Sequence, residues 1–142
     1  MYEVLTSLEL TAIERLARAE LGGEALAAID KALDEMDFAV RKRDVDRWAK
    51  ADERFHRILV TLCGNSRLAA MVEMLWEQSH RARMTTVQLR ASLAQSNREH
   101  RAVIDAIRRH DGHQARTRHA KHRARAKAEI LKLLQQTRLG SF

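Results

Sequence analysis

The chain has 142 residues, of which 45% are hydrophobic and 32% are charged, and its formal net charge is +7. This length suits one domain with its own core, and the mixture excludes a disordered chain. No apolar run approaches the roughly 18 residues of a membrane span, Met1 to Leu10 lack a secretory signal, and the lone Cys63 excludes a disulfide framework. We therefore expect a cytoplasmic protein without a membrane partner.

Proline is absent, glycine occurs five times, and aromatic residues make up 4% of the chain. This composition removes the usual helix breakers and the residues that strands favour, so it predicts an all-α fold. The first predicted helix runs from Tyr2 to about Glu20 and stops before Gly22-Gly23. The second has an apolar stripe over 26–40 and ends in the charged segment 41–44.

The third predicted helix has its apolar stripe over 48–62 and ends at Gly64-Asn65, a pair that favours a helix stop. Ser66 is the expected N-cap of the fourth helix, whose stripe covers 68–75 and which continues or breaks before Ser92.

The fifth predicted helix runs through 93–107 to Asp111-Gly112, and the last covers about 113–136. Short connections make successive helices antiparallel neighbours. The predicted fold is an antiparallel bundle of six or seven helices in one domain spanning 1–142.

Four polar side chains fall on the apolar stripes and should therefore point into the bundle. Asp52 and His56 are one turn apart and flank Phe55, while His100 and His122 lie on the stripes of the last two helices. Burying three imidazoles and a carboxylate is costly unless something binds them, and a divalent cation does so. This N3O set suits Zn²⁺ best, with Ni²⁺, Mn²⁺ or Fe²⁺ as alternatives, and leaves coordination positions free.

Ordinary structural roles are the alternative. Asp52 and His56 can form a plain side-chain pair on a helix, and each of His80, His110, His113 and His119 can be a surface or hydrogen-bonded histidine. His119, one turn before His122, is the substitute ligand if the predicted register is wrong by a turn.

The sequence resembles the C-terminal ligand-binding (FCD) domain of GntR-type transcription regulators of the FadR subfamily. The resemblance covers nearly the whole chain and rests on a combination of short blocks. These are Tyr2-Glu3-Val4 with Leu8-Glu9, Asp52-Glu53-Arg54-Phe55-His56, Leu62-Cys63-Gly64-Asn65, Glu99-His100 and a final His122.

The resemblance implies a metal held by Asp52, His56, His100 and His122 beside a cavity for a small organic acid, and it implies homodimers. In such regulators an N-terminal winged helix-turn-helix binds DNA, and the effector bound in the bundle alters operator affinity. The first predicted helix starts at once, so we expect that winged domain to lie outside this chain.

One residue departs from the family pattern. Members often carry an arginine shortly after the Glu-Val of the first helix, where this chain has Leu5. Arg81, Arg83 and Arg90 are the cations that can replace it. Ser96 and Asn97 share the face of His100 and are the other predicted ligand-binding residues beside Arg83.

Two other function classes compete with the sensor. A metal-dependent hydrolase can use a helical Asp/His site, and His110-Asp111 superficially suggests one, yet this pair lies at a helix end outside the predicted set. Nucleic-acid binding by the basic last helix is the other class, but its charges surround the helix and no aromatic residues interleave with them. We therefore predict a non-enzymatic sensor domain.

Overall fold

The computed structural model describes residues 2–139, although not the side chains of residues 138 and 139, and within this range it contains six helices and no strand. The helices are α1 Tyr2–Arg18, α2 Gly23–Arg41, α3 Val45–Leu62, α4 Ser66–Val87, α5 Leu93–Arg108 and α6 Gly112–Leu139. The predicted all-α bundle is confirmed. None of the described helices is long and apolar enough to cross a membrane.

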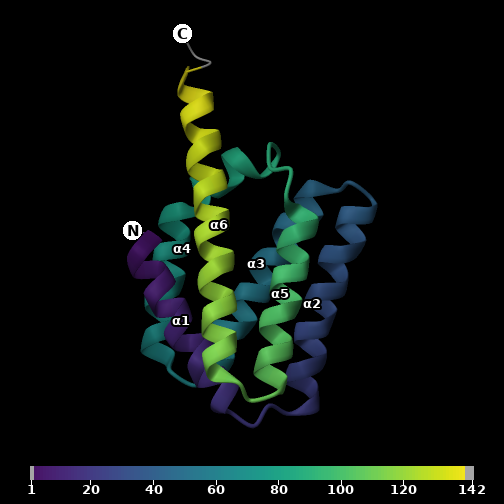
Figure 1. The fold of residues 1–142 in the computed structure, drawn as a ribbon, viewed down its shortest axis with the longest axis vertical. Helices are drawn as coiled ribbons and strands as arrows, with labels where there is room; N and C mark the ends of the chain where they lie inside the picture. Colours follow the sequence, from purple (N-terminus) through teal and green to yellow (C-terminus); the bar gives the residue numbers. More distant parts are fainter. Residues whose placement is uncertain (1, 140–142) are drawn as a thin grey trace.

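The helices form a bundle in which α6 packs along both α1 and α5 (Figure 1). On one side α2 packs against α3, and on the other α1 contacts α4. The C-terminal part of α6 extends past the ends of the other helices. This arrangement places α3, α5 and α6 where their buried faces share one interior.

One end of the fourth helix differs from the prediction, and its other end, which the sequence left open, is defined by the structure. The N-cap of α4 is Asn65, whose Oδ1 accepts a hydrogen bond from the Leu68 N–H at 3.0 Å, so the prediction of Ser66 was wrong by one residue. The fourth helix does stop before Ser92, at Val87, so the weak helix formers Thr85 and Thr86 still lie within it. Thr85 and Thr86 donate to the carbonyls of Arg81 and Ala82, each at 2.8 Å, and so fit within the helix.

The core has two apolar clusters. The larger includes residues from all six helices, with Val87 as the contribution of α4, and is built around residues such as Leu16, Met36 and Phe55. The smaller joins α1, α3 and α4, and it includes Leu5, which is 1% exposed. Leu5, the departure from the family pattern, is therefore a core residue of this chain. The buried polar residues are Glu9, His56, Ser79, Thr86, Ser96, Asn97, His100, His119 and His122.

Candidate metal centre

Three histidines from three different helices meet inside the bundle. His56 on α3, His100 on α5 and His122 on α6 are all buried, and one ring nitrogen of each lies within 4.8 Å of the other two. The Nε2 atoms of His100 and His122 are 3.0 Å apart. A separation this short between imidazole nitrogens is compatible with shared binding of one ion.

Asp52 completes the group from α3. Its Oδ1 lies 3.3 Å from His56 Nε2 and 3.4 Å from His100 Nε2. Burial raises the pKa of the Asp52 carboxyl, but the neighbouring His56 and His100 lower it by more, so the carboxylate is ionised. The structure thus brings together the four residues that the helical spacing had singled out.

The protonation of the imidazoles suits metal ligands. His122 Nδ1 lies 2.7 Å from Glu99 Oε1, which places the proton on Nδ1 and directs the Nε2 lone pair inward. Burial lowers the pKa of His122, the hydrogen bond with Glu99 opposes this, and the net value is about 4. Burial also places the pKa of His100 well below its ordinary value. Neutral imidazoles beside an ionised carboxylate are a donor set that fits a divalent ion.

His100 occupies the centre of the group. It is 0% exposed, its ring lies 4.7 Å from the ring of Phe55, and its buried Nδ1 has no hydrogen-bond partner among the described residues. Packing against Phe55 therefore orients this imidazole, whereas a hydrogen bond orients His122.

A second buried polar cluster lies beside the histidines and was missed by the sequence reasoning. The Glu9 carboxylate accepts from Trp76 Nε1 at 3.2 Å and lies 2.9 Å from Arg123 Nε and 3.6 Å from His119 Nε2. Burial raises the pKa of Glu9, but Arg123 and His119 bring the net value down to about 2. The available signal was a glutamate on the apolar stripe of the first helix, four residues after Leu5.

His119, the predicted substitute ligand, belongs to this second cluster. It is 2% exposed, and its ring centre lies 6.1 Å from those of both His56 and His122. It is not part of the group whose ring nitrogens converge. Its nearest charged neighbour is Glu9, so it has a structural partner of its own.

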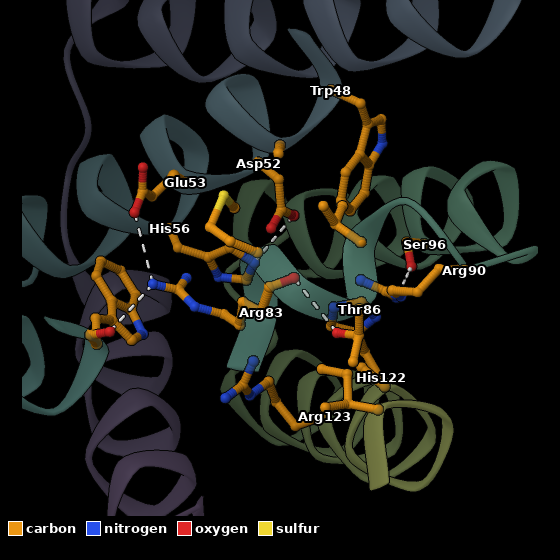
Figure 2. Close-up of a pocket in the computed structure, with 16 residues that line it drawn as sticks. Trp48, Asp52, Glu53, His56, Arg83, Thr86, Arg90, Ser96, His122 and Arg123 are labelled. Carbon is orange, nitrogen blue, oxygen red and sulfur yellow. Dashed lines mark hydrogen bonds and ion pairs between the residues drawn. The ribbon is translucent and has the colours of Figure 1, made fainter. Parts of the chain in front are cut away.

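A cavity of about 50 Å³ adjoins the histidines (Figure 2). That is room for several water molecules. Asp52, His56 and His122 line it together with two tryptophans, three arginines and Ser96. The remaining lining residues are Ala49, Glu53, Met84, Thr86, Val87, Ala126 and Ile130.

The predicted ligand-binding residues divide into two groups. Ser96 and Arg83 line the cavity, and so does Arg90, whereas Arg81 is exposed and does not. Asn97 does not line the cavity either. Its Oδ1 accepts from Trp48 Nε1 at 2.8 Å and its Nδ2 donates to Asp37 at 3.0 Å, so its amide orients Trp48 instead.

Arg83 lies where the cavity meets a groove on the surface. The groove shares Glu53, Trp76 and Arg83 with the cavity. Arg83 Nη2 donates to the Trp76 carbonyl at 3.2 Å and lies 3.5 Å from Glu53 Oε1, while its buried Nε has no hydrogen-bond partner among the described residues. A charged donor is thus available at this end of the cavity.

A family model described as the FCD domain matches residues 1–125. The chain belongs to the FCD domain family. This confirms the family that the sequence blocks indicated. FCD domains of transcription regulators are regulatory and non-enzymatic, which agrees with the prediction of a sensor and does not favour a hydrolase. His110 also lies outside the histidine group, because its Nδ1 contacts the Ala17 carbonyl at 2.9 Å.

Individual relatives point the same way. Over 62 residues this chain is 42% identical to a protein of Agrobacterium vitis, the uncharacterized HTH-type transcriptional regulator in the TAR-I ttuE-ttuC' intergenic region. The match covers 42% of this chain and 36% of that protein. The chain therefore spans only about a third of that relative's length.

Two solved structures share the fold. E. coli McbR/YncC superposes with a TM-score of 0.82 at 18% identity, covering 92% of this chain and 65% of that one. The metal-free FCD domain of TM0439 superposes with a TM-score of 0.74 at 22% identity, covering 95% and 91% respectively.

From the buried histidines we predict that this chain, in the absence of metal, loses stability in mild acid. The folded pKa of His122, about 4, lies below its ordinary value of 6.5, so the unfolded chain takes up the proton first and the free energy of unfolding falls as pH drops from 6.5 towards 4. His100 and His119 act in the same direction. Glu9 and Glu99, with pKa values of about 2, contribute a loss only below about pH 4.5.

We expect a loss of at least about 2 kcal/mol between pH 7 and pH 5, the share of His122 alone, measured by urea unfolding with a chelator present. His119→Gln should flatten the profile because it removes one buried imidazole. His80→Ala should not, because that side chain is 53% exposed. A flat profile in the unaltered chain between pH 7 and pH 5 would contradict this reading of the histidines.

Proposed function

We propose that this chain is the effector-sensing domain of a GntR/FadR-type transcription regulator, and that it binds one divalent metal and a small carboxylate. The observation that carries the proposal is the convergence of three buried imidazoles, two of which contact the ionised carboxylate of Asp52. Without a cation, the negative charge of the Asp52 carboxylate would lie beside these imidazoles with few N–H donors to offset it.

Asp52, His56, His100 and His122 would hold the metal. Three nitrogens and one oxygen favour Zn²⁺, with Ni²⁺, Mn²⁺ or Fe²⁺ as alternatives. When bound, the ion supplies positive charge and open coordination positions for an acidic ligand. These four residues and the ion would serve to recognise the acidic ligand and not to catalyse a reaction, because FCD domains are regulatory.

Arg83, Arg90 and Ser96 would receive the carboxylate effector. Arg83 Nε is a buried donor without a partner, and Arg90 donates to Ser96 Oγ at 3.2 Å within the cavity wall. These cations take the place of the arginine that family members carry near Leu5. A cavity of about 50 Å³ favours an acid of few carbons.

We propose that a winged helix-turn-helix domain attached to this one binds the operator, that the regulator is a cytoplasmic homodimer, and that DNA is contacted only through the winged domain. A preference of the acid for one arrangement of the helices by about 1 to 3 kcal/mol would couple its binding to operator affinity.

The acid site is tested by titrating the Zn²⁺-loaded chain with mono-, di- and tricarboxylates of two to six carbons in a calorimeter. We expect at least one to bind, and Arg83→Gln to weaken that acid by about 10- to 100-fold, the value of a hydrogen bond to a charged group. The metal content should stay unchanged.

Arg81→Gln is the matched control, because Arg81 lies on the same helix but is exposed and outside the cavity. Equal losses in the two variants would show that only the overall charge matters. Failure of every acid to bind at millimolar concentration would contradict a carboxylate sensor.

A further inference from the structure

We infer that Glu99, held by Arg125, is the positioning residue that prepares His122 to bind metal. The inference rests on the proposed metal centre and goes beyond it, because it names what fixes one of the ligands before any ion arrives. Glu99 precedes His100 on α5, and His122 and Arg125 lie one turn apart on α6.

The Glu99 carboxylate fixes the tautomer of His122. Glu99 Oε1 accepts a hydrogen bond from His122 Nδ1 at 2.7 Å, and the opposite ring nitrogen, Nε2, faces His100 Nε2 at 3.0 Å. A neutral imidazole carries one proton, so a proton held on Nδ1 leaves Nε2 with its lone pair directed at the centre of the group. A carboxylate behind a metal-binding histidine also raises the basicity of the ligand nitrogen.

Arg125 holds the carboxylate in place. Its Nε lies 2.9 and 2.8 Å from the two Glu99 oxygens, and its Nη2 lies 2.6 Å from Oε1. The other side of the guanidinium is held too, since Nη1 donates to Ser92 Oγ at 2.8 Å and Nη2 to Ser96 Oγ at 2.9 Å. A planar guanidinium with this many partners has little freedom to rotate, so Glu99 has little freedom as well.

The three histidines of the group differ in what contacts their Nδ1 atoms. His100 Nδ1 has no hydrogen-bond partner among the described residues, and His56 Nδ1 lies 4.0 Å from Glu9 Oε1, beyond hydrogen-bond distance. Within this group, only His122 has a carboxylate within hydrogen-bond distance of its Nδ1, the nitrogen that faces away from the other two rings. The turn of α5 that contributes His100 therefore also orients the ligand contributed by α6, which ties the two helices at the site.

Four variants of the full chain test the inference, with Zn²⁺ alone as the probe. Glu99→Leu removes the acceptor, Glu99→Gln keeps its shape without its charge, and Arg125→Lys removes the two-pronged contact. Glu129→Gln is the matched control, because Glu129 also contacts Arg125, at 3.5 Å, and Arg90, at 3.4 Å, but no interaction joins it to a histidine of the group. Zn²⁺ affinity is measured by competition with a chromophoric chelator.

We expect Glu99→Leu to weaken Zn²⁺ binding by about 10- to 100-fold, the range found for partners behind metal-binding histidines. Glu99→Gln and Arg125→Lys should fall between this variant and the unaltered chain, and Glu129→Gln should match the unaltered chain. In the metal-free protein, the ¹⁵N shifts of the His122 ring should report the Nδ1–H tautomer, and Glu99→Leu should lose it. A role in folding alone would not change the tautomer in a variant that still folds.

Three outcomes overturn claims separately. If the unaltered chain binds no Zn²⁺, both the proposed metal centre and this inference fail. If it binds Zn²⁺ and Glu99→Leu binds equally well, this inference alone fails. It also fails alone if Glu129→Gln weakens binding as much as Glu99→Leu, because a general charge effect then accounts for the loss.

Discussion

Replacing His100 by alanine is expected to weaken Zn²⁺ binding by about 100- to 1,000-fold. Structural zinc sites bind with about 10 to 16 kcal/mol, so one of four ligands accounts for roughly 2.5 to 4 kcal/mol. His100 is the central member, because its Nε2 contacts both Asp52 and His122. In the unaltered chain, saturating Zn²⁺ should raise the thermal midpoint by about 10 °C, since a ligand at 100 to 1,000 times its Kd adds about 2.7 to 4.1 kcal/mol.

His119→Ala is the control for this experiment. His119 is as deeply buried as His100 and lies one turn from His122, but it is outside the converging group. Both variants lose a buried imidazole and should be less stable without metal, yet only His100→Ala should lose the stabilisation by Zn²⁺. A Zn²⁺-dependent rise that survives in His100→Ala and disappears in His119→Ala would move the site to the Glu9 cluster.

Replacing Glu9 by alanine is expected to lower the free energy of unfolding by about 3 to 5 kcal/mol, the cost of breaking a buried ion pair on one side. Glu9 is 2% exposed and pairs with Arg123, whose side chain is 13% exposed. The substitution leaves that guanidinium uncompensated and removes the acceptor of the buried Trp76 N–H. The loss would be measured by urea unfolding at pH 7 in the presence of a chelator.

Glu14→Ala is the control for Glu9→Ala, because it removes a glutamate from an exposed ion pair instead of a buried one. Glu14 lies on the same helix and pairs with Arg116 at 3.3 Å, but both side chains are more than a third exposed. An exposed pair contributes only about 0 to 1 kcal/mol, so this variant should be nearly as stable as the unaltered chain. Similar losses in the two variants would mean that the Glu9 pair contributes no more than a surface pair.

The spacing of apolar residues along the sequence was sufficient to predict the helices and the four polar residues that meet in the interior. The three- and four-residue spacing of apolar side chains determines which face of each helix is buried, and Asp52, His56, His100 and His122 all lie on such faces. Their convergence then follows from packing α3, α5 and α6 in one bundle. The combination of sequence blocks gave the family independently of this spacing.

The hydrogen-bond and ion-pair partners of the buried polar residues could not be predicted from this spacing. Asn97 shares the face of His100, but its amide is engaged by Trp48 and by Asp37, 60 positions away in the sequence. Glu9 pairs with Arg123, a contact that depends on how α1 and α6 are aligned. Such pairings are set by helix register and rotamers, to which a single sequence without a structure gives no access.

The Leu5 position shows how a family pattern and a particular chain can diverge. Where members carry an arginine, this chain has an apolar residue that is 1% exposed and packs with Val72 and Trp76. The cations that face the cavity come instead from α4 with Arg83, from the segment after it with Arg90, and from α6 with Arg123. If the proposed acid site binds as argued above, its specificity should therefore differ from that of members with the arginine.

The most direct test is a crystal of the Zn²⁺-loaded chain with anomalous diffraction recorded on both sides of the zinc absorption edge. We predict one strong anomalous peak per chain, enclosed by the Nε2 atoms of His56, His100 and His122 and by the Asp52 carboxylate. A well-ordered interior without a peak there, or a peak at Glu9 and His119, would contradict the assignment of these four residues.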